Sequence, residues 1–308
     1  MPMQPPAPGS LRILHLSDTH LTGDGALHQG SVDTTTALDA VLGHVDGVPG
    51  VGLVVVSGDV SEDGSAESYR TARERIGAWA ERHGAALVLV PGNHDLREGF
   101  RQVLANGHVL GEGGSPLAHT MEYLPPTVPV SGQTTVAGFR VVTVDTSVPG
   151  AGYGELSGTA LERLRSALAE EPVPHGTVVV LHHPPLPSPT LLHEALRLQD
   201  PEDLAGLLDG SDVRVVLAGH QHHHAAGSLA GVPVLVAPGV ANDTDVVGPY
   251  DEESAHVAHG ALVVDVAADG SVWSTPVRVT DPDRDALAFS LDADTVARIA
   301  QQAGPAAR

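Results

Sequence analysis

The chain has 308 residues, 42% of them hydrophobic, so it is long enough to bury a substantial core as one large domain or two ordinary ones. It contains no cysteine, which excludes disulfides, thiolate metal ligands, iron–sulfur clusters and cysteine nucleophiles. All 16 basic residues are arginines and the formal net charge is -22, which excludes lysine chemistry and argues against a nucleic-acid partner.

The sequence begins with MPMQPPAPGS, which has neither the basic segment nor the apolar segment of a secretory signal. No run approaches about 18 consecutive apolar residues, the length that a membrane-spanning helix requires. We therefore expect a soluble, cytoplasmic protein without a membrane partner.

Apolar, β-branched runs alternate with helical patterns along most of the chain. Such alternation predicts a layered α/β fold with a largely parallel sheet. The expected strands are Leu11–Leu16, Gly52–Ser57, Ala85–Val90, Phe139–Val144, Thr177–Leu181, Val213–Ala218 and Val232–Ala237. The expected helices are Asp33–Val45, Ser65–Arg82, Ser157–Ala169 and Pro201–Leu208.

The C-terminal part predicts a hairpin followed by a short helix. The runs ALVVDV and SVWSTPVRV flank Ala268, Asp269 and Gly270, which are typical of a tight turn. The sequence DADTVARIAQQA favours a short helix. We expect a catalytic domain over residues 1–280 and a C-terminal tail, which carries this helix, over residues 281–308. Two long stretches, the proline-rich one over 183–200 and the acidic one over 240–260, are expected to be loops.

Five of the expected strands run directly into polar side chains that can bind metal ions. Taken alone, each has a simpler interpretation, since a lone histidine is more often solvated or hydrogen-bonded than a ligand. Because ligands bind beyond the carboxyl ends of strands in an open α/β sheet, these segments are expected to converge. Seven candidate ligands exceed the need of one tetrahedral zinc and fit two bridged ions. They are Asp18, His20, Asp59, Asn93, His182, His220 and His222.

The stretch LAGHQHHHAAG, residues 217–227, carries four histidines, and not all of them are expected to be ligands. If the backbone stays extended after Gly219, His220 and His222 point to the same side and His223 to the other. His224 shares the side of His220 but lies about 6 to 7 Å beyond His222 in an extended chain. We therefore predict that His220 and His222 bind metal and that His223 and His224 do not.

The order of these motifs resembles that of the calcineurin-like metallophosphoesterases, over about residues 11–279. The motifs LSDTHL, SGDV, PGNHD, VDTSVPG, LHHPP and LAGHQH are similar to those of class III cyclic nucleotide phosphodiesterases of the bacterial cyclic-AMP type. The resemblance implies a four-layer α/β/β/α sandwich. It also implies one ion held by Asp18, His20, Asp59 and His222, and a second held by Asp59, Asn93, His182 and His220. In this assignment Asp59 bridges the ions, His94 faces the substrate and Asp95 orients His94.

The activity that the resemblance implies is hydrolysis of 3',5'-cyclic AMP to a 5'-monophosphate by a hydroxide that bridges two divalent ions. The ligands suit manganese or iron, with zinc or cobalt as alternatives. The expected binding partner is a small phosphodiester. By analogy with the family, the protein could also form a homo-oligomer. The same chemistry could act on glycerophosphodiesters, 2',3'-cyclic nucleotides or lipid-linked phosphates. A non-catalytic binding protein is disfavoured, because such relatives lose ligands whereas this chain keeps all seven and His94.

Overall fold

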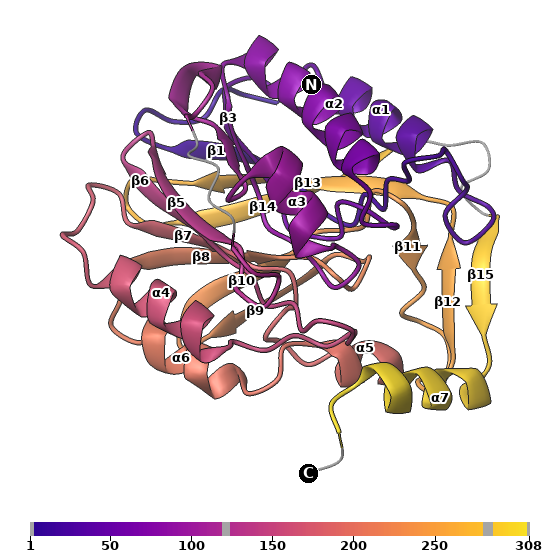
Figure 1. Ribbon diagram of the computed structural model, residues 1–308. Helices are drawn as coiled ribbons and strands as arrows, with labels where there is room; N and C mark the ends of the chain where they lie inside the picture. Colours follow the sequence, from indigo (N-terminus) through magenta and orange to yellow (C-terminus); the bar gives the residue numbers. More distant parts are fainter. Residues whose placement is uncertain (1–2, 119–123, 280–285, 307–308) are drawn as a thin grey trace.

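Two six-stranded β-sheets pack face to face at the centre of the protein (Figure 1). The computed structural model describes residues 3–118, 124–279 and 286–306. In order across the first sheet, the strands are β14 (Val272–Val279), β13 (His259–Val266), β1 (Leu11–Leu16), β2 (Val51–Val56), β3 (Ala86–Leu89) and β4 (His108–Leu110). The second sheet runs β5 (Ser131–Val136), β6 (Phe139–Val144), β7 (Thr177–Val180), β8 (Val213–Ala218), β10 (Val232–Val236) and β9 (Ala225–Leu229).

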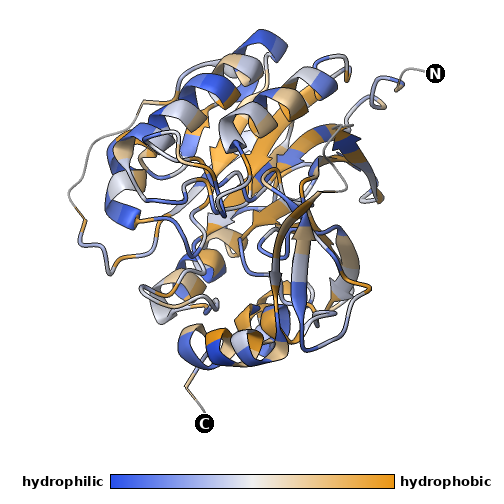
Figure 2. Ribbon diagram, turned by 90° about the vertical axis from the view of Figure 1, so that its right-hand side faces the viewer, coloured by the Kyte–Doolittle hydropathy of each residue, from blue (hydrophilic) through white to orange (hydrophobic). Residues whose placement is uncertain are grey.

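Helices cover the outer face of each sheet, which completes four layers. The first sheet packs against α1 (Thr34–Val45) and α2 (Ala66–His83), and the second against α4 (Gly158–Leu168) and α6 (Pro201–Leu208). Figure 2 shows the hydrophobic strands enclosed by helices whose outer faces are hydrophilic. The predicted four-layer α/β/β/α sandwich is therefore confirmed.

The strands are hydrophobic on both faces because each sheet borders two cores. Ile13 of β1 packs between the sheets, whereas Leu14 and Leu16 pack against the helices on the outer face. All three side chains are fully buried, and each such burial stabilises the fold by roughly 1.5–3 kcal/mol. This explains why the sequence shows continuous apolar runs in place of a strict polar alternation.

Both sheets are parallel in the middle and antiparallel at their edges. The parallel parts are β1 with β2 and β3, and β6 with β7, β8 and β10. The expectation of a largely parallel sheet is correct for these centres and wrong for the edges. The edge strands β4, β5 and β9 are absent from the sequence-based prediction because they are short or carry half-exposed polar and small residues.

The C-terminal part forms more structure than the sequence predicts. The hairpin of β13 and β14 is confirmed, and it turns over residues 267–271. The stretch expected to be an acidic loop holds β11 (Asp243–Thr244) and β12 (Glu253–His256), which form a third sheet with β15 (Leu287–Leu291). The proline-rich stretch likewise holds α5 (Leu191–Leu196). Both loop expectations are wrong at these residues, since short elements give little periodic signal.

The terminal helix α7 (Ala293–Ala303) is confirmed and packs against α5 through Leu192, Leu196 and Val296. The expected boundary after residue 280 lies outside the described residues, so the division into 1–280 and 281–308 stays a prediction. Between β3 and β5 the chain also forms α3 (Arg97–Leu104) and the short 3-10 helix η1 (Glu112–Gly114). Within the described residues, no helix is both long and apolar enough to cross a membrane.

Candidate metal centre

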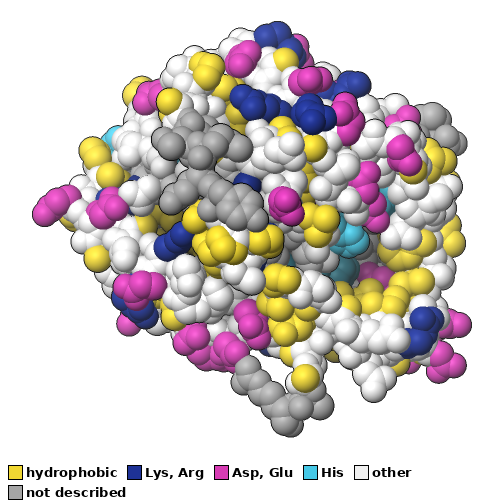
Figure 3. All heavy atoms as spheres, in the orientation of Figure 1, with side chains coloured by type: hydrophobic (Ala, Val, Ile, Leu, Met, Phe, Trp, Pro, Cys, Tyr) yellow, Lys and Arg dark blue, Asp and Glu magenta, His cyan; other side chains and the backbone are white. Residues whose placement is uncertain are grey.

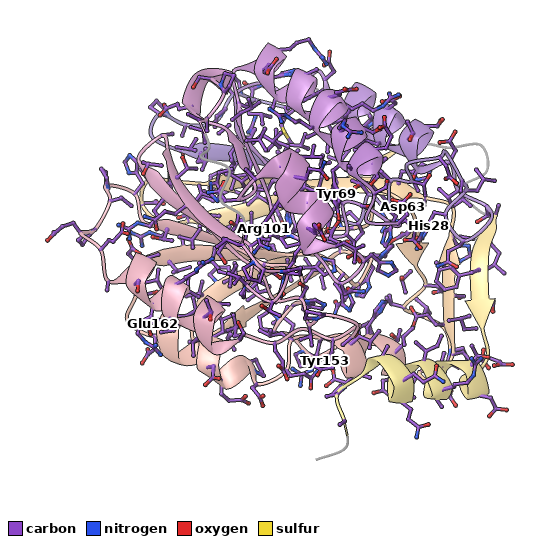
Figure 4. The ribbon with its side chains drawn as sticks, viewed as in Figure 1. His28, Asp63, Tyr69, Arg101, Tyr153 and Glu162 are labelled. Atoms are coloured by element: carbon purple, nitrogen blue, oxygen red, sulfur yellow. The ribbon has the colours of Figure 1, made fainter. Side chains whose placement is uncertain are left out.

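The seven predicted ligands lie together where strands of both sheets end. Asp18 and His20 follow β1, Asp59 follows β2 and Asn93 follows β3. The second sheet contributes the residues that follow β7 and β8, namely His182, His220 and His222. Figure 3 shows histidine side chains in a hollow of this face of the molecule, and Figure 4 shows His28 near the same region.

The ligand atoms converge in two adjoining groups. In the first, His222 Nε2 lies 3.1 Å from His20 Nε2 and 3.4 Å from Asp18 Oδ1. In the second, His182 Nε2 lies 3.3 Å from Asp59 Oδ2 and 3.2 Å from the Asn93 side-chain oxygen. The same Asp59 oxygen lies 3.7 Å from His20 Nε2, so this carboxylate stands between the groups. Its position fits the predicted bridge.

The hydrogen bonding of His182 fits a bound cation. Its Nδ1 lies 2.7 Å from the Ser57 carbonyl oxygen, which can only accept, so Nδ1 carries the proton. In the neutral ring Nε2 is then an acceptor, yet it faces oxygens of Asn93 and Asp59 that also accept. These three atoms, His182 Nε2 and the oxygens of Asn93 and Asp59, are all acceptors, so a second proton on the ring or a bound metal ion must lie between them.

The surroundings of two further histidines, His20 and His220, are those expected of metal ligands. His20 Nδ1 lies 2.6 Å from Glu62 Oε2, the outer hydrogen bond that fixes the tautomer and leaves Nε2 free to bind metal. His220 Nε2 is buried without a hydrogen-bond partner among the described residues. An unpaired buried nitrogen is costly unless something binds it, so the donor set fits a dinuclear centre.

The backbone at the site is strained. Among the described residues, ten other than glycine have positive φ angles, and five of these ten are candidate ligands. Each such conformation costs roughly 1–3 kcal/mol and persists only where the surrounding structure enforces it. The strain thus coincides with the metal centre. The five ligands are Asp18 (54°), His20 (43°), Asp59 (47°), His220 (73°) and His222 (52°).

Two glycines of the motifs allow the ligands to approach one another. A Cβ atom at Gly58 would lie 2.3 Å from His182 Nδ1, and one at Gly92 would lie 2.1 Å from Asp59 Oδ1. No side chain can occupy either position without displacing a candidate ligand. The glycines of SGDV and PGNHD are therefore part of how the centre is built.

The backbone of the four-histidine stretch is not extended as expected, and which of its four rings bind metal stays a prediction. His220 and His222 have left-handed backbones, so the chain is not extended there. His220 groups with His182, and His222 with Asp18 and His20. His223 and His224 belong to none of the metal-competent clusters found among the described residues. Their Nδ1 atoms lie 2.8 Å from Gln221 O and 2.9 Å from Val236 O.

We predict that single alanine substitutions separate the two pairs. His220→Ala and His222→Ala should each weaken one ion, because each removes a nitrogen from a different group. His223→Ala and His224→Ala should retain two ions per chain. Metal content measured by mass spectrometry after dialysis checks this. Loss of an ion in His224→Ala, with full occupancy in His222→Ala, would show that the assignment is reversed.

The surroundings of His94 differ from the expected pairing with Asp95. His94 Nδ1 lies 3.2 Å from Glu62 Oε2, and its ring is partly exposed at the mouth of the site. The buried Asp95 carboxylate instead accepts backbone N–H groups of Val60, Ser61 and Gly92. Asp95 therefore holds two ligand-bearing loops together, while Glu62 is the carboxylate that contacts His94.

The sequence-based prediction does not include three residues near the centre, namely Glu62, His28 and His183. Glu62 Oε2 lies within 3.3 Å of Nδ1 of His20, His28 and His94. His183 lies in one group with His182 and His220, and its Nδ1 lies 2.8 Å from Thr146 Oγ1. Their positions in the sequence could have identified two of them as candidates, since Glu62 comes three residues after Asp59 and His183 comes directly after His182.

The pKa values divide the histidines into neutral and charged rings. Burial lowers the pKa of His20 to about 4 and that of His220 well below its ordinary value, so both rings are neutral. For His182 burial is outweighed by the Asp59 carboxylate, which raises its pKa to about 9, so this ring must lose a proton when it binds a metal ion. For His94 burial is outweighed by the carboxylates of Asp59 and Glu62, which raise its pKa to about 9. His94 is therefore a charged donor near neutral pH.

Comparison with known proteins agrees with this geometry. A model of the calcineurin-like phosphoesterase family matches residues 11–224. A probable cyclic nucleotide phosphodiesterase of Rhodococcus erythropolis is 35% identical over 95% of this chain and 91% of its own. A cAMP/cGMP dual specificity phosphodiesterase of Mycobacterium tuberculosis is 33% identical over 85% of this chain and 78% of its own.

The chain is also similar to a more distant relative and to a solved structure. A probable glycerophosphodiester phosphodiesterase of Arcobacter nitrofigilis is 27% identical over 73% of this chain and 77% of its own. The solved purple acid phosphatase of yellow lupin superimposes with a TM-score of 0.56 at 18% identity, covering 99% of this chain and 58% of that one, which shows a shared fold. With the family model matching most of its length and the two ligand groups in place, the chain belongs to the calcineurin-like phosphoesterases.

Proposed function

We propose that the protein is a dinuclear-metal phosphodiesterase that hydrolyses 3',5'-cyclic AMP to 5'-AMP. The observation that carries the proposal is the convergence of seven nitrogen and oxygen ligands in two groups that share Asp59. A cyclic nucleotide substrate is supported by the names of relatives at 33% and 35% identity, and the name of the first of these includes cyclic AMP beside cyclic GMP. Manganese and iron are the ions that we expect, since both suit imidazole and carboxylate ligands.

The charge of the centre suits a phosphodiester. Asp18 and Asp59 supply two negative charges against four positive charges of two divalent ions, so the site attracts an anion although the chain carries -22 overall. When bound, the ions would stabilise the phosphoryl oxygens and lower the pKa of a bound water. By holding the two ions, the seven candidate ligands would determine where the phosphate of the substrate binds.

His94 is the residue best placed to act on the leaving oxygen. Its Nδ1 is directed to Glu62, so Nε2 is available to a substrate at the mouth of the site. A charged imidazole can donate a hydrogen bond, and then a proton, to the oxygen that carries negative charge as its bond to phosphorus breaks. Glu62, which holds no ion in this assignment, favours the protonated form of the ring.

A second candidate function is hydrolysis of glycerophosphodiesters, which a relative at 27% identity favours. Purified protein loaded with manganese should be assayed against 3',5'-cyclic AMP, 2',3'-cyclic AMP and glycerophosphodiesters, with products separated by chromatography. We expect 5'-AMP as the product from 3',5'-cyclic AMP. Efficient cleavage of the other diesters with no detectable 5'-AMP would refute the proposal in favour of the second candidate.

A further inference from the structure

A cleft of about 400 Å³ opens directly beside the metal centre. Asn93, a candidate ligand, lines one end of it, and the start of α3 and the turn after β6 line the rest. A substrate whose phosphate lies at the metal centre can therefore extend into this cleft.

The open surface of the cleft is largely apolar. Leu96 is 60% exposed although it is a large hydrophobic residue, and Pro126, Val148 and Pro149 line the same cleft. An exposed apolar surface next to a reaction centre is typical of a pocket for the uncharged part of a substrate.

The polar groups of the cleft are already engaged within the protein. The buried Arg97 donates from Nε to Asp145 at 2.7 Å, and from its two terminal nitrogens to Pro126 O at 3.1 Å and Ser147 O at 2.7 Å. The Ser147 hydroxyl donates to Asp145 at 2.6 Å. These bonds tie the opposite walls together, so the cleft is already formed before a ligand binds.

The charges of the cleft exclude a phosphate. Arg97 is committed to its partners, and no other cation lies among the described residues that line the cleft. The exposed carboxylate of Glu98 at its rim would repel an anion. The cleft therefore suits an uncharged, largely apolar group that is covalently attached to the phosphate.

The motif VDTSVPG, residues 144–150, gains a role from this arrangement. It carries none of the seven candidate ligands, but its residues Ser147, Val148, Pro149 and Gly150 form one wall of the cleft. On the opposite side the exposed Gln102 also lines the cleft. An amide offers the donor and acceptor pair that matches the N6 and N7 edge of adenine.

We propose that this cleft is the nucleobase subsite, in which an adenine attached to the phosphate packs on Leu96, Val148 and Pro149 and is read by Gln102. The inference rests on the proposed function and names the part of the chain that selects its substrate. Glycerophosphodiesters lack a base and gain nothing from the apolar walls.

The first test fills the cleft. Val148→Trp should lower kcat/KM for 3',5'-cyclic AMP by about 10- to 100-fold, mostly through KM, because a bulky ring takes the place of the base. It should leave inhibition by inorganic phosphate unchanged, since phosphate does not enter the cleft. Leu287→Trp, at an exposed leucine on β15 outside the cleft, is the matched control and should behave as the wild type.

The second test uses an exposed side chain whose replacement does not threaten folding. Gln102→Leu should lower the ratio of kcat/KM for cyclic AMP over cyclic GMP by about tenfold, as expected for loss of a bidentate base contact. Wild-type protein that cleaves glycerophosphodiesters but not cyclic AMP would overturn the proposed function together with the subsite. Normal cyclic AMP turnover in wild type, with kcat/KM unaltered in both variants, would overturn the subsite alone.

Discussion

Asp59→Asn is expected to abolish measurable turnover and to weaken both metal ions. The substitution preserves the size of the side chain but removes the charge that lies between the two ligand groups, 3.3 Å from His182 and 3.7 Å from His20. One of the two asparagine positions would also carry an NH2 group, which cannot bind a cation. Asp59 Oδ1 also accepts the backbone N–H of His94 at 2.9 Å, so the single oxygen of asparagine can serve this hydrogen bond or the metal ions but not both.

Metal content and affinity after dialysis, measured beside activity, check this expectation. Asp209→Asn, at an exposed aspartate that ends α6, is the control and should keep both ions and full activity. Two ions retained at unchanged affinity in Asp59→Asn would show that this carboxylate does not bridge.

His94→Ala is expected to retain both ions and to lose about 10² to 10⁴ in kcat, the range for a positioned acid or oxyanion donor. The ring stands at the mouth of the site, where it contacts Glu62 and forms a cluster with Glu62 and His20. It is not one of the seven predicted ligands, so its removal should leave both ions in place. Because Glu62 favours the charged form of the ring, its removal takes away the hydrogen-bond donor that we propose for the leaving oxygen.

A steady-state comparison with metal analysis on the same preparation separates the two effects. His44→Ala, at an exposed histidine near the end of α1, is the control for loss of an imidazole and should have wild-type kinetics. An activity loss in His94→Ala that follows metal loss would mean that His94 acts as a ligand.

The sequence predicts the centre of the fold and the location of the site because both depend on strong local signals. Long β-branched runs such as Val213–Ala218 identify buried strands, and the polar residues that follow each run mark the sheet ends. Once those strands are correct, the convergence of their ends follows from the geometry of α/β sheets. The glycines of the motifs reinforce the signal, since Gly58 and Gly92 stand where a Cβ atom would collide with a ligand.

The remaining features depend on contacts between distant residues. The extended backbone expected at His220 and His222 fails because Asp18, about 200 residues earlier, accepts the His220 N–H and helps to hold a left-handed turn. Glu62 is inconspicuous in the sequence because its role arises only when His20, His28 and His94 surround it. Strand β12 is polar and short, and it is defined by pairing with β15 some 35 residues later.

The division of the ligands between the two sheets has a consequence for how the protein gains its stability. A hydrogen bond joins His182 Nδ1 to Ser57 O at 2.7 Å across the sheets, and the ligand groups draw on residues from Asp18 to His222. Such a site forms only after the sheets have docked, so ions bind the native chain and have no equivalent site in the unfolded one. Metal at about a thousand times its dissociation constant would add about 4 kcal/mol to unfolding, a large part of a typical domain's total. Chelation is therefore expected to lower the free energy of unfolding as well as to stop turnover.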